Sequence, residues 1–567
     1  MKKSALILAI LIGLALLIIV PRAIYLNLGP DTRRLSDTNL KATALTFLQA
    51  AASGGAAAYF FADKKYTSLN GMIVAVPIAA YYGVMQARGV FADMADFGEA
   101  FALKETTEYF WIQAFMLALN ALVILLILAA AKKYPRTSSR RSVLYALALV
   151  ATSPYLFTFS TLPRIHSIAL LFAALALFAS LRLVKNKSPL AIFLAFGLAG
   201  LAFACTQVGF VLFVAPLLAY LASADETGRA RILWPRLWSW GLVAWGGLGA
   251  SLSIMLGYPR LLLALFNPGE FALYGSVLSA SHPHVVVFGP EWITRFLSQP
   301  YWAGELAASA AAVFFLVYVL WWRRDHDAYE VVAAGPIVLY TVFTFPLMGF
   351  VSGYFAIVIL PSLMYLGARM LEYAKEEKLN ILYACLLIII LVQGVRIALL
   401  TRTIAGGESI YSARIILLAE TSRDDRILGS FDSNVLGIPP SPESLRTVAT
   451  TSLGRADQEI LSKNLEGKFS RHYTYALPGD IVESVRRTPQ AYTYIVLSEA
   501  SPEDTQALCT LGYTPAHTIV AHPTGAAERT EIVSVHNIFD TPSLPFVRAI
   551  GPNITIYAKG PCDIKSP

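Results

Sequence analysis

The sequence is poor in charge. Only 14% of its 567 residues are Asp, Glu, Lys or Arg, against about 25% in soluble globular domains. Hydrophobic residues make up 56% of the chain. This balance excludes an ordinary soluble protein and predicts an integral membrane protein. The formal net charge is +8, but the basic residues stand in short clusters between apolar runs. That pattern is typical of membrane topology and gives nucleic acid almost no weight as a partner.

Cysteine is also scarce, and the four cysteines say little about the class of protein. Cys205 and Cys385 lie in apolar runs, whereas Cys509 and Cys562 lie in the polar C-terminal part. The last two can pair if that part faces an oxidising compartment, but the sequence does not give their separation.

Ionisable residues are nearly absent from the apolar runs, whose polar residues are isolated ones such as Gln113, Asn120 and Gln393. Transporters and proton pumps usually carry ionisable residues at membrane depth, because ions must be handled there. Charged and imidazole side chains gather here in the loops between the runs instead. This distribution favours chemistry at one face of the membrane.

The topology follows from the N-terminus and from the basic clusters. Two lysines precede an apolar run to Val20, and Pro21-Arg22 follows where a small-residue cleavage site would be needed. We interpret this run as an uncleaved first span with its N-terminus inside. If the later apolar runs alternate in direction, almost every Lys/Arg cluster falls on the inner side, which supports about eleven spans. Residues 22–108 then form a large first outer loop.

Residues 404–567 are not membrane-like, and we expect them to form a small α/β domain after a transmembrane domain of residues 1–403. Ser501 reads as a helix N-cap with Pro502 at the first helical position, and Gly512 reads as a stop. Short β-rich stretches are separated by turn residues. These stretches are Arg426–Phe431, Tyr492–Leu497, Thr518–Ala521, Glu531–Val535 and Ile554–Tyr557.

The first outer loop carries the residue types that sugar transfer requires. Soluble nucleotide-activated donors are normally made on the inner side, so an outer-face enzyme would use a donor tethered to a lipid. Such a reaction needs a carboxylate to take a proton from the acceptor hydroxyl, and Lys or Arg to neutralise a phosphate leaving group. The loop offers Asp37 at the start of a helix-like run, and Lys64 and Lys65 after it.

The order of motifs resembles a known family. Leu35-Ser36-Asp37-Thr38 falls at an acidic motif, Ser53-Gly54-Gly55 at a small-residue turn, Lys64-Lys65-Tyr66 at a basic motif, and Met72–Tyr82 at a surface helix. Together they resemble the GT-C superfamily of membrane glycosyltransferases, in particular the bacterial branch related to protein O-mannosyltransferases and to the aminoarabinose transferase of lipid A. Two later segments are similar to family spans, and the likeness covers most of residues 1–400 as a pattern of spans and loops. These segments are Leu198–Phe203 and Gly353–Pro361.

The resemblance implies a GT-C-like, mainly α helix bundle in which Asp37 is the catalytic base. It assigns contact with the donor phosphate to Lys64 and Lys65, to which Arg164 is added. Thr38 stands where the family has Glu, the prolines after the lysine are absent, and Gln207 stands where Lys is common. The outer loop 160–166 lacks the second carboxylate of many relatives, which weakens a metal-dependent mechanism because hard cations want several oxygen ligands. We therefore predict no cofactor, and a divalent cation is not supported.

Each candidate also has a simpler interpretation. Asp37 can be a helix N-cap, with Asp31 its nearest rival as the base. Lys64 and Lys65 can lie at the membrane interface beside Tyr66. The remaining substrate-binding candidates are His166, which can be a solvated helix entry like Arg164, and the loop residues His282, His284 and Glu291, where an acceptor-binding loop is more plausible than a metal site.

The sequence thus predicts a multi-pass glycosyltransferase of the cell (inner) membrane, embedded among membrane lipids. It would move a sugar from a polyprenyl-phosphate donor to a lipid, glycan or protein acceptor. The active site and the C-terminal domain would face the periplasmic or extracellular side. The alternatives are a lipid or polysaccharide transporter and a non-catalytic scaffold of an envelope-assembly complex.

Overall fold

The computed structural model divides into two compact units, each described here by itself. The helical unit comprises the described residues of Met1–Ala23, Leu40–Val76 and Ile112–Ala398, and the second unit those of Pro77–Trp111 and Leu399–Pro567. The structure describes residues 12–23, 44–45, 47–48, 51, 68–102, 107–134, 140–159, 165–224, 230–259, 305–323, 327–344, 353–407, 409–422, 425–430, 472–488, 491–522 and 551–562.

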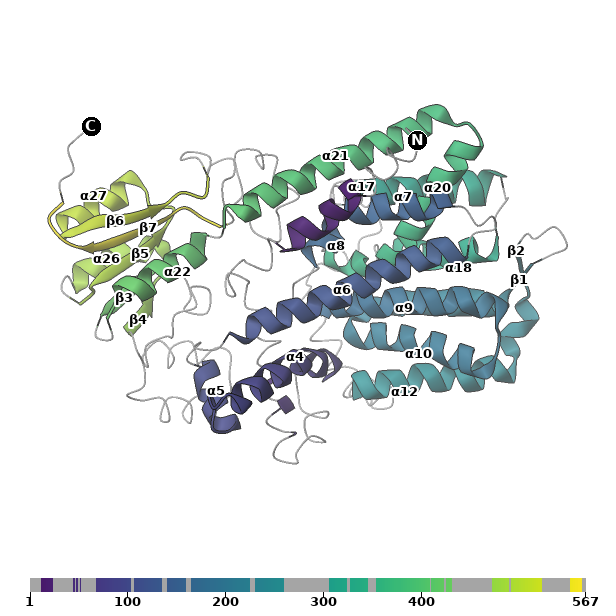
Figure 1. Ribbon diagram of the computed structural model, residues 1–567, viewed down its shortest axis with the longest axis horizontal. Helices are drawn as coiled ribbons and strands as arrows, with labels where there is room; N and C mark the ends of the chain where they lie inside the picture. Colours follow the sequence, from purple (N-terminus) through teal and green to yellow (C-terminus); the bar gives the residue numbers. More distant parts are fainter. Residues whose placement is uncertain are drawn as a thin grey trace. The chain divides into compact units, whose positions relative to one another are not determined.

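The helical unit is a bundle of apolar helices (Figure 1). It begins with the N-terminal helix Ile12–Ala23. Its further elements are α6 (Glu108–Lys133), α7 (Arg140–Ala151), α8 (Pro154–Thr158), α9 (Ile165–Lys185), α10 (Pro189–Cys205), η1 (Gln207–Phe213), α11 (Val214–Leu221), β1 (Ala222–Ala224), β2 (Ala230–Ile232), η2 (Trp234–Trp238), η3 (Leu242–Gly246), α12 (Gly247–Gly257), α17 (Leu306–Phe314), η4 (Phe315–Arg323), α18 (Ala328–Leu339), η5 (Tyr340–Thr344), η6 (Gly353–Ile359), α20 (Leu360–Glu376) and α21 (Asn380–Ala405).

Among the described residues, five helices are long and apolar enough to cross a membrane, and shorter apolar helices accompany them. The predicted fold class is therefore confirmed: the protein is a mainly α membrane bundle with a small C-terminal α/β domain. The number of spans stays a prediction. The five helices are Leu69–Ala87, Glu108–Lys133, His166–Lys185, Ala356–Glu376 and Asn380–Thr403.

Small residues bring α10 and α12 close together. The Cβ of an alanine at Gly249 would lie 2.4 Å from the carbonyl oxygen of Phe193, and one at Gly200 would lie 3.0 Å from that of Ala250. Packing through small residues is common between helices in membranes because it lets the backbones approach. After Cys205 the chain leaves α10 and continues as η1 and α11.

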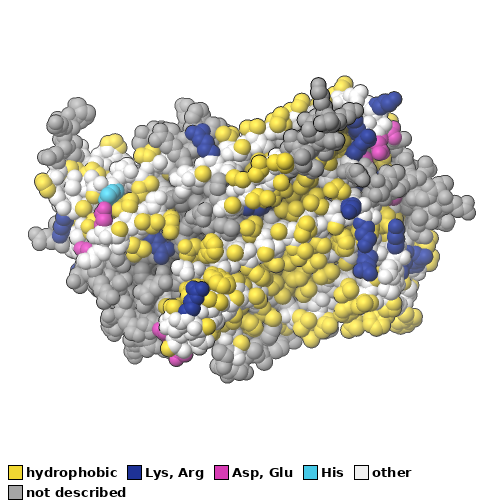
Figure 2. Space-filling view, in the orientation of Figure 1, with side chains coloured by type: hydrophobic (Ala, Val, Ile, Leu, Met, Phe, Trp, Pro, Cys, Tyr) yellow, Lys and Arg dark blue, Asp and Glu magenta, His cyan; other side chains and the backbone are white. Residues whose placement is uncertain are grey.

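One end of the helical unit, the basic end, collects helix termini rich in Lys and Arg. Lys187, in the turn between α9 and α10, donates a hydrogen bond to the carbonyl oxygen of Ala222 after α11. The Lys185 ammonium at the end of α9 lies 5.8 Å from the ring centre of Tyr329 at the start of α18. Figure 2 shows Lys and Arg side chains gathered at this end. The clustering of basic residues agrees with the alternation of spans that the sequence predicts.

The other end, the α8 end, is held together by different contacts. The Asn120 side chain of α6 donates to the carbonyl oxygen of Leu156 in α8 (3.2 Å). Ala307, near the start of α17, donates its backbone N–H to Gln393 of α21 (3.1 Å). The apolar stretch that ends at Phe159 thus contains two helices, α7 and α8. They separate at Thr152 and Ser153 because Ser153 caps α8 and Pro154 occupies its first turn.

Part of the predicted first outer loop is helical. Helix α4 (Ser68–Ala87) contains Pro77 and is long and apolar enough to cross a membrane, so the surface helix expected at Met72–Tyr82 is part of a longer helix. Helix α5 (Met94–Ala102) follows. The carboxylate of Asp93 accepts the backbone N–H groups of Ala95 and Asp96, which caps the start of α5.

The C-terminal domain, in the second unit, is a five-stranded sheet in the order β4-β3-β5-β7-β6 (Figure 1). Strand β3 is parallel to β4 and β5, whereas β7 is antiparallel to β5 and β6. Successive residues of a strand, such as Ile427 and Leu428 of β3, enter separate apolar clusters, as expected when both faces of a sheet are covered. Its elements are α22 (Ser409–Glu420), β3 (Arg426–Gly429), β4 (His472–Tyr475), η7 (Pro478–Asp480), α26 (Ile481–Arg487), β5 (Tyr494–Ser498), α27 (Pro502–Thr510), β6 (Tyr513–Ile519) and β7 (Ile554–Lys559).

Most local predictions for this domain are confirmed. Ser501 forms a capping box with Asp504 at the start of α27, and Gly512 ends the segment with φ +83°. Three predicted strands match β3, β5 and β7, a fourth overlaps β6, and the stretch 531–535 lies outside the described residues. Cys509 and Cys562 form a disulfide bond with a Cα–Cα distance of 5.5 Å. This pairing, which the sequence left open, ties α27 to the chain after β7.

Candidate functional site

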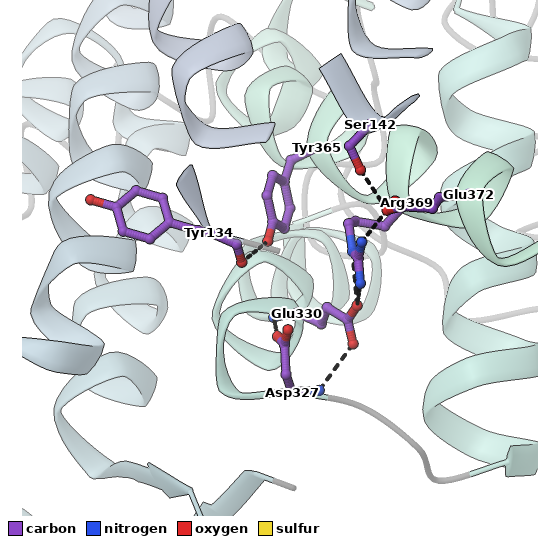
Figure 3. A network of polar contacts seen from close by, with 7 residues as sticks. All are labelled: Tyr134, Ser142, Asp327, Glu330, Tyr365, Arg369 and Glu372. Carbon is purple, nitrogen blue, oxygen red and sulfur yellow. Dashed lines mark hydrogen bonds and ion pairs between the residues drawn. The ribbon is translucent and has the colours of Figure 1, made fainter. Parts of the chain in front are cut away.

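Each end of the helical unit contains a buried cluster of polar side chains. At the basic end, Arg369 of α20 donates from Nε and Nη2 to one carboxylate oxygen of Glu330 in α18, both at 3.0 Å. Its Nη1 donates to Glu372, which also accepts the Ser142 hydroxyl of α7 at 2.5 Å (Figure 3). We call these four residues the Arg369 cluster.

Neighbouring contacts complete the Arg369 cluster. The second oxygen of Glu330 accepts the backbone N–H of Asp327 at 3.0 Å, and the Asp327 carboxylate accepts the N–H of Glu330 at 2.8 Å. This capping box begins α18. Tyr365 donates to the carbonyl oxygen of Tyr134 at 3.1 Å (Figure 3). The cluster joins α7, α18 and α20, and all side-chain nitrogens of Arg369 have partners, so we assign it a structural role.

At the α8 end, the buried carboxylate of Glu305 stands at the start of an apolar helix. Glu305 immediately precedes α17 and is 1% exposed. Its Oε1 accepts the Ser153 hydroxyl and the backbone N–H of Tyr155 (2.9 Å). Ser153 in turn accepts the N–H of Leu156 at 3.0 Å, as the N-cap of α8. Glu305 thereby fixes the first turn of α8 against α17.

The environment of Glu305 changes its acidity. It lies just outside the apolar helix Leu306–Val319. Burial raises the pKa of the Glu305 carboxyl to about 8, and the hydrogen bonds from Ser153 and Tyr155 oppose that rise only in part. A carboxyl with a pKa near neutrality can exist in both protonation states, which is the property required for proton transfer.

Two further side chains lie near aromatic rings, one in α8 and one in Phe159, the residue that follows α8. The guanidinium carbon of Arg22 lies 6.0 Å from the ring centre of Phe157. The ring of His166, at the start of α9, lies with its centre 6.2 Å from that of Phe159. Glu305 therefore contacts the first turn of α8, Arg22 lies near the ring of Phe157 within it, and His166 lies near the ring of Phe159 just after it. We call Arg22, Ser153, His166 and Glu305 the α8 cluster.

The structure locates one of the predicted site residues. His166 lies half-buried at the α8 end, beside the ring of Phe159. Every other predicted site residue lies outside the described residues. These are Asp37, Lys64, Lys65, Tyr66, Arg164, His282, His284 and Glu291. Over the described part of the chain, no group of three or more His, Cys, Asp or Glu side chains is placed to hold a metal ion.

Sequence reasoning missed Arg22 and Glu305, and it described the spans as nearly free of charge. The structure corrects that description, because Glu330, Arg369 and Glu372 are also buried within the bundle. The sequence does hold a signal for the two missed residues. Each is a single charge adjoining an apolar run, Arg22 after Pro21 and Glu305 before Leu306, and isolated charges at membrane level are often functional.

No protein-family model matches the sequence. A search of curated proteins found no match either. Among solved structures, the chain is similar to the crystal structure of ArnT from Cupriavidus metallidurans bound to undecaprenyl phosphate. The two share 12% identity with a TM-score of 0.46, over 98% of this chain and 98% of that chain.

Two further structures are similar. One is the cryo-EM structure of the arabinofuranosyltransferase AftD from Mycobacteria, with 13% identity, a TM-score of 0.39, and coverage of 97% of this chain and 41% of that one. The other is an oligosaccharyltransferase of Archaeoglobus fulgidus in complex with Zn and sulfate, with 11% identity, a TM-score of 0.35, and coverage of 88% and 80%.

Proposed function

We propose that this protein is a GT-C-type glycosyltransferase that moves a sugar from a polyprenyl-phosphate carrier to an acceptor at the outer face of the membrane. The observation that carries the proposal is the difference between the two ends of the helical unit. The basic end is closed by the Arg369 cluster. At the α8 end, a carboxyl and a guanidinium lie against α8, and an imidazole lies near the ring of Phe159 that follows it.

Two independent observations support the proposed orientation. Loops rich in Lys and Arg are retained on the cytoplasmic side, so the basic end is assigned to the cytoplasm and the α8 end to the outside. The disulfide Cys509–Cys562 supports an extracytoplasmic C-terminal domain, because disulfides persist in oxidising compartments. An outer site requires a donor that reaches it through the membrane, which favours a lipid-linked sugar.

In this proposal Asp37 is the general base, and Lys64, Lys65 and Arg164 bind the donor phosphate. These roles come from the sequence resemblance. Glu305 holds the first turn of α8, and in the sequence α8 is followed shortly by Arg164 and by His166 of α9. A transporter is not favoured. It would need a buried charge that is open to its cargo, whereas the buried Arg369 at the basic end of the described bundle is paired with two carboxylates.

The test is transfer of radiolabelled pentose, hexose or aminosugar from polyprenyl-phosphate donors to membrane acceptors by the full-length protein. We expect Asp37→Asn to lower the rate by about 100-fold or more, as removal of a general base does. Asp96→Asn is the matched control, because Asp96 is exposed and accepts only the nearby N–H of Ala92. Equal rates for Asp37→Asn and wild type would exclude Asp37 as the base. No transfer by the wild type from any of these donors would contradict the proposed function.

A further inference from the structure

Arg22 is a buried cation with unused hydrogen-bond donors. It lies at the end of the N-terminal helix and is 4% exposed. Its Nη1 donates to the carbonyl oxygen of Ile18, one turn back in the same helix, at 2.9 Å. Nε and Nη2 are buried and have no hydrogen-bond partner. A guanidinium carries five N–H donors and keeps its charge in proteins, so most of its donor capacity is unused.

The positive charge of Arg22 is also uncompensated. None of the ion pairs among the described residues includes it. The ring of Phe157, 6.0 Å away, supplies a cation–π contact, which is weaker than a carboxylate partner. A buried charge without a counter-charge is strongly unfavourable unless a ligand provides one.

The unused nitrogens have the geometry of an anion fork. Nε and Nη2 form one edge of the guanidinium, with parallel N–H bonds. Arg369 uses the same two nitrogens to bind Glu330, both at 3.0 Å. Carboxylates and phosphates are the groups that match this edge.

The simpler interpretation is that Arg22 extends to lipid headgroups, as many arginines at the ends of spans do. That interpretation requires the guanidinium to be open to its surroundings. Instead, Arg22 is enclosed by protein atoms alone, since its exposed fraction is 4% without any lipid. A phosphate reaches Nε and Nη2 only when neighbouring side chains move, and the unpaired buried charge is what favours its entry.

We propose that Arg22 binds the phosphate group of a polyprenyl-phosphate carrier through Nε and Nη2, beside Phe157 of α8. The inference rests on the proposed function, because a transferase of this kind must hold its polyprenyl-phosphate carrier where the α8 end meets the membrane. Arg22 then contacts the carrier directly and is a substrate-binding residue. Phe157 packs against the guanidinium and keeps the Nε–Nη2 edge in place.

The test is binding of radiolabelled polyprenyl phosphate to the full-length protein in phosphatidylcholine nanodiscs. We expect Arg22→Gln to weaken binding about 10- to 100-fold, as loss of charge-assisted hydrogen bonds does, and Arg22→Lys to be intermediate because it keeps the charge without the fork. Arg141→Gln, an exposed arginine at the basic end, is the matched control and should bind like the wild type. Unchanged binding by Arg22→Gln would overturn the proposal.

Competition distinguishes the sources of phosphate. Displacement by excess inorganic phosphate but not by phosphatidylglycerol supports a phosphate site reserved for the carrier. Equal displacement by phosphatidylglycerol would show a general headgroup site and overturn the assignment to the carrier. Because binding needs no turnover, Arg22-dependent binding without any sugar transfer would refute the proposed function and leave the phosphate site standing.

Thermal unfolding without ligand separates a binding role from a structural one. Arg22→Met removes an unpaired buried charge, so its melting temperature should equal or exceed that of the wild type. Polyprenyl phosphate should raise the melting temperature of the wild type and leave that of the variant unchanged. A clear fall in the melting temperature of ligand-free Arg22→Met would show a structural role and overturn the proposal.

Discussion

At the basic end of the helical unit, Arg369 donates to two carboxylates from all its side-chain nitrogens. At the α8 end, Arg22 donates to the backbone carbonyl oxygen of Ile18 and lies near the ring of Phe157. Both arginines are 4% exposed. The two ends therefore bury the same cation to the same degree, but only one of them supplies the counter-charge from within the protein.

The carboxylates show the same contrast. Glu330 uses both oxygens, one for Arg369 and one for the backbone of Asp327. Glu305 accepts two hydrogen bonds on Oε1 and has no cation partner. A buried charge that has a counter-charge holds helices together, whereas one without it is costly to fold. Among the described residues, one oxygen of Glu372 in the Arg369 cluster also lacks a hydrogen-bond partner, so the contrast between the two ends lies in their ion pairs. The contrast supports a structural role for the basic end and agrees with the proposal that chemistry occurs at the α8 end.

The largest effect should come from breaking the Arg369 cluster. Arg369→Met leaves Glu330 and Glu372 buried without a cation, so we expect a loss of about 3–5 kcal/mol of stability. The measurement is thermal unfolding of the purified full-length protein. Arg22→Met is the matched variant at the other end and should not lose stability. Similar losses for both variants would remove the distinction between the two ends.

The sequence was enough to predict the general architecture, because membrane spans and basic clusters are local features. It also predicted the cap at Ser501, which depends on a few adjacent residues. Strand β4 was missed: it is short, lies at one edge of the sheet and pairs only with β3. Its assignment depends on a partner about fifty residues earlier, which local β-propensity does not reveal.

The buried clusters were not predictable for the same reason. Ser142 and Glu372 are 230 residues apart in sequence, and Ser153 and Glu305 are 152 apart. A hydropathy profile shows Arg22 and Glu305 only as the ends of apolar runs. It does not distinguish a charged side chain that faces water from one that is buried in the bundle. Burial and partner atoms decide this, and both come from the packing of distant helices.

A smaller effect should come from the charge of Glu305, and it depends on pH. The folded pKa of about 8 lies above the value of about 4.3 in an unfolded chain. The protonated carboxyl therefore stabilises the folded state at low pH, and this contribution is lost as the pH rises through 8. Glu305→Gln keeps the acceptor oxygen for Ser153 and Tyr155 but cannot ionise.

Thermal unfolding at pH 5 and at pH 9 measures this difference. We expect wild type and Glu305→Gln to be equally stable at pH 5. At pH 9 the variant should be more stable by an amount on the order of 3 kcal/mol. Asp93→Asn, in an exposed cap, should show no comparable divergence. Parallel pH profiles for wild type and Glu305→Gln would show that Glu305 is not held in a protonated state, and would weaken its place in the α8 cluster.

The smallest effect compares two serine caps of similar construction. Ser153 caps α8 at one end of the bundle, Ser188 caps α10 at the other, and a proline follows each. Ser188 accepts the N–H of Ala191, whereas Ser153 accepts that of Leu156 and also donates to Glu305. Loss of a cap costs about 1 kcal/mol, and loss of the bond to Glu305 should add about 1 kcal/mol to Ser153→Ala. Thermal unfolding of the two alanine variants at pH 7 measures the difference. If Ser188→Ala is equally destabilising, the hydrogen bond to Glu305 contributes nothing, and α8 is held by its cap alone.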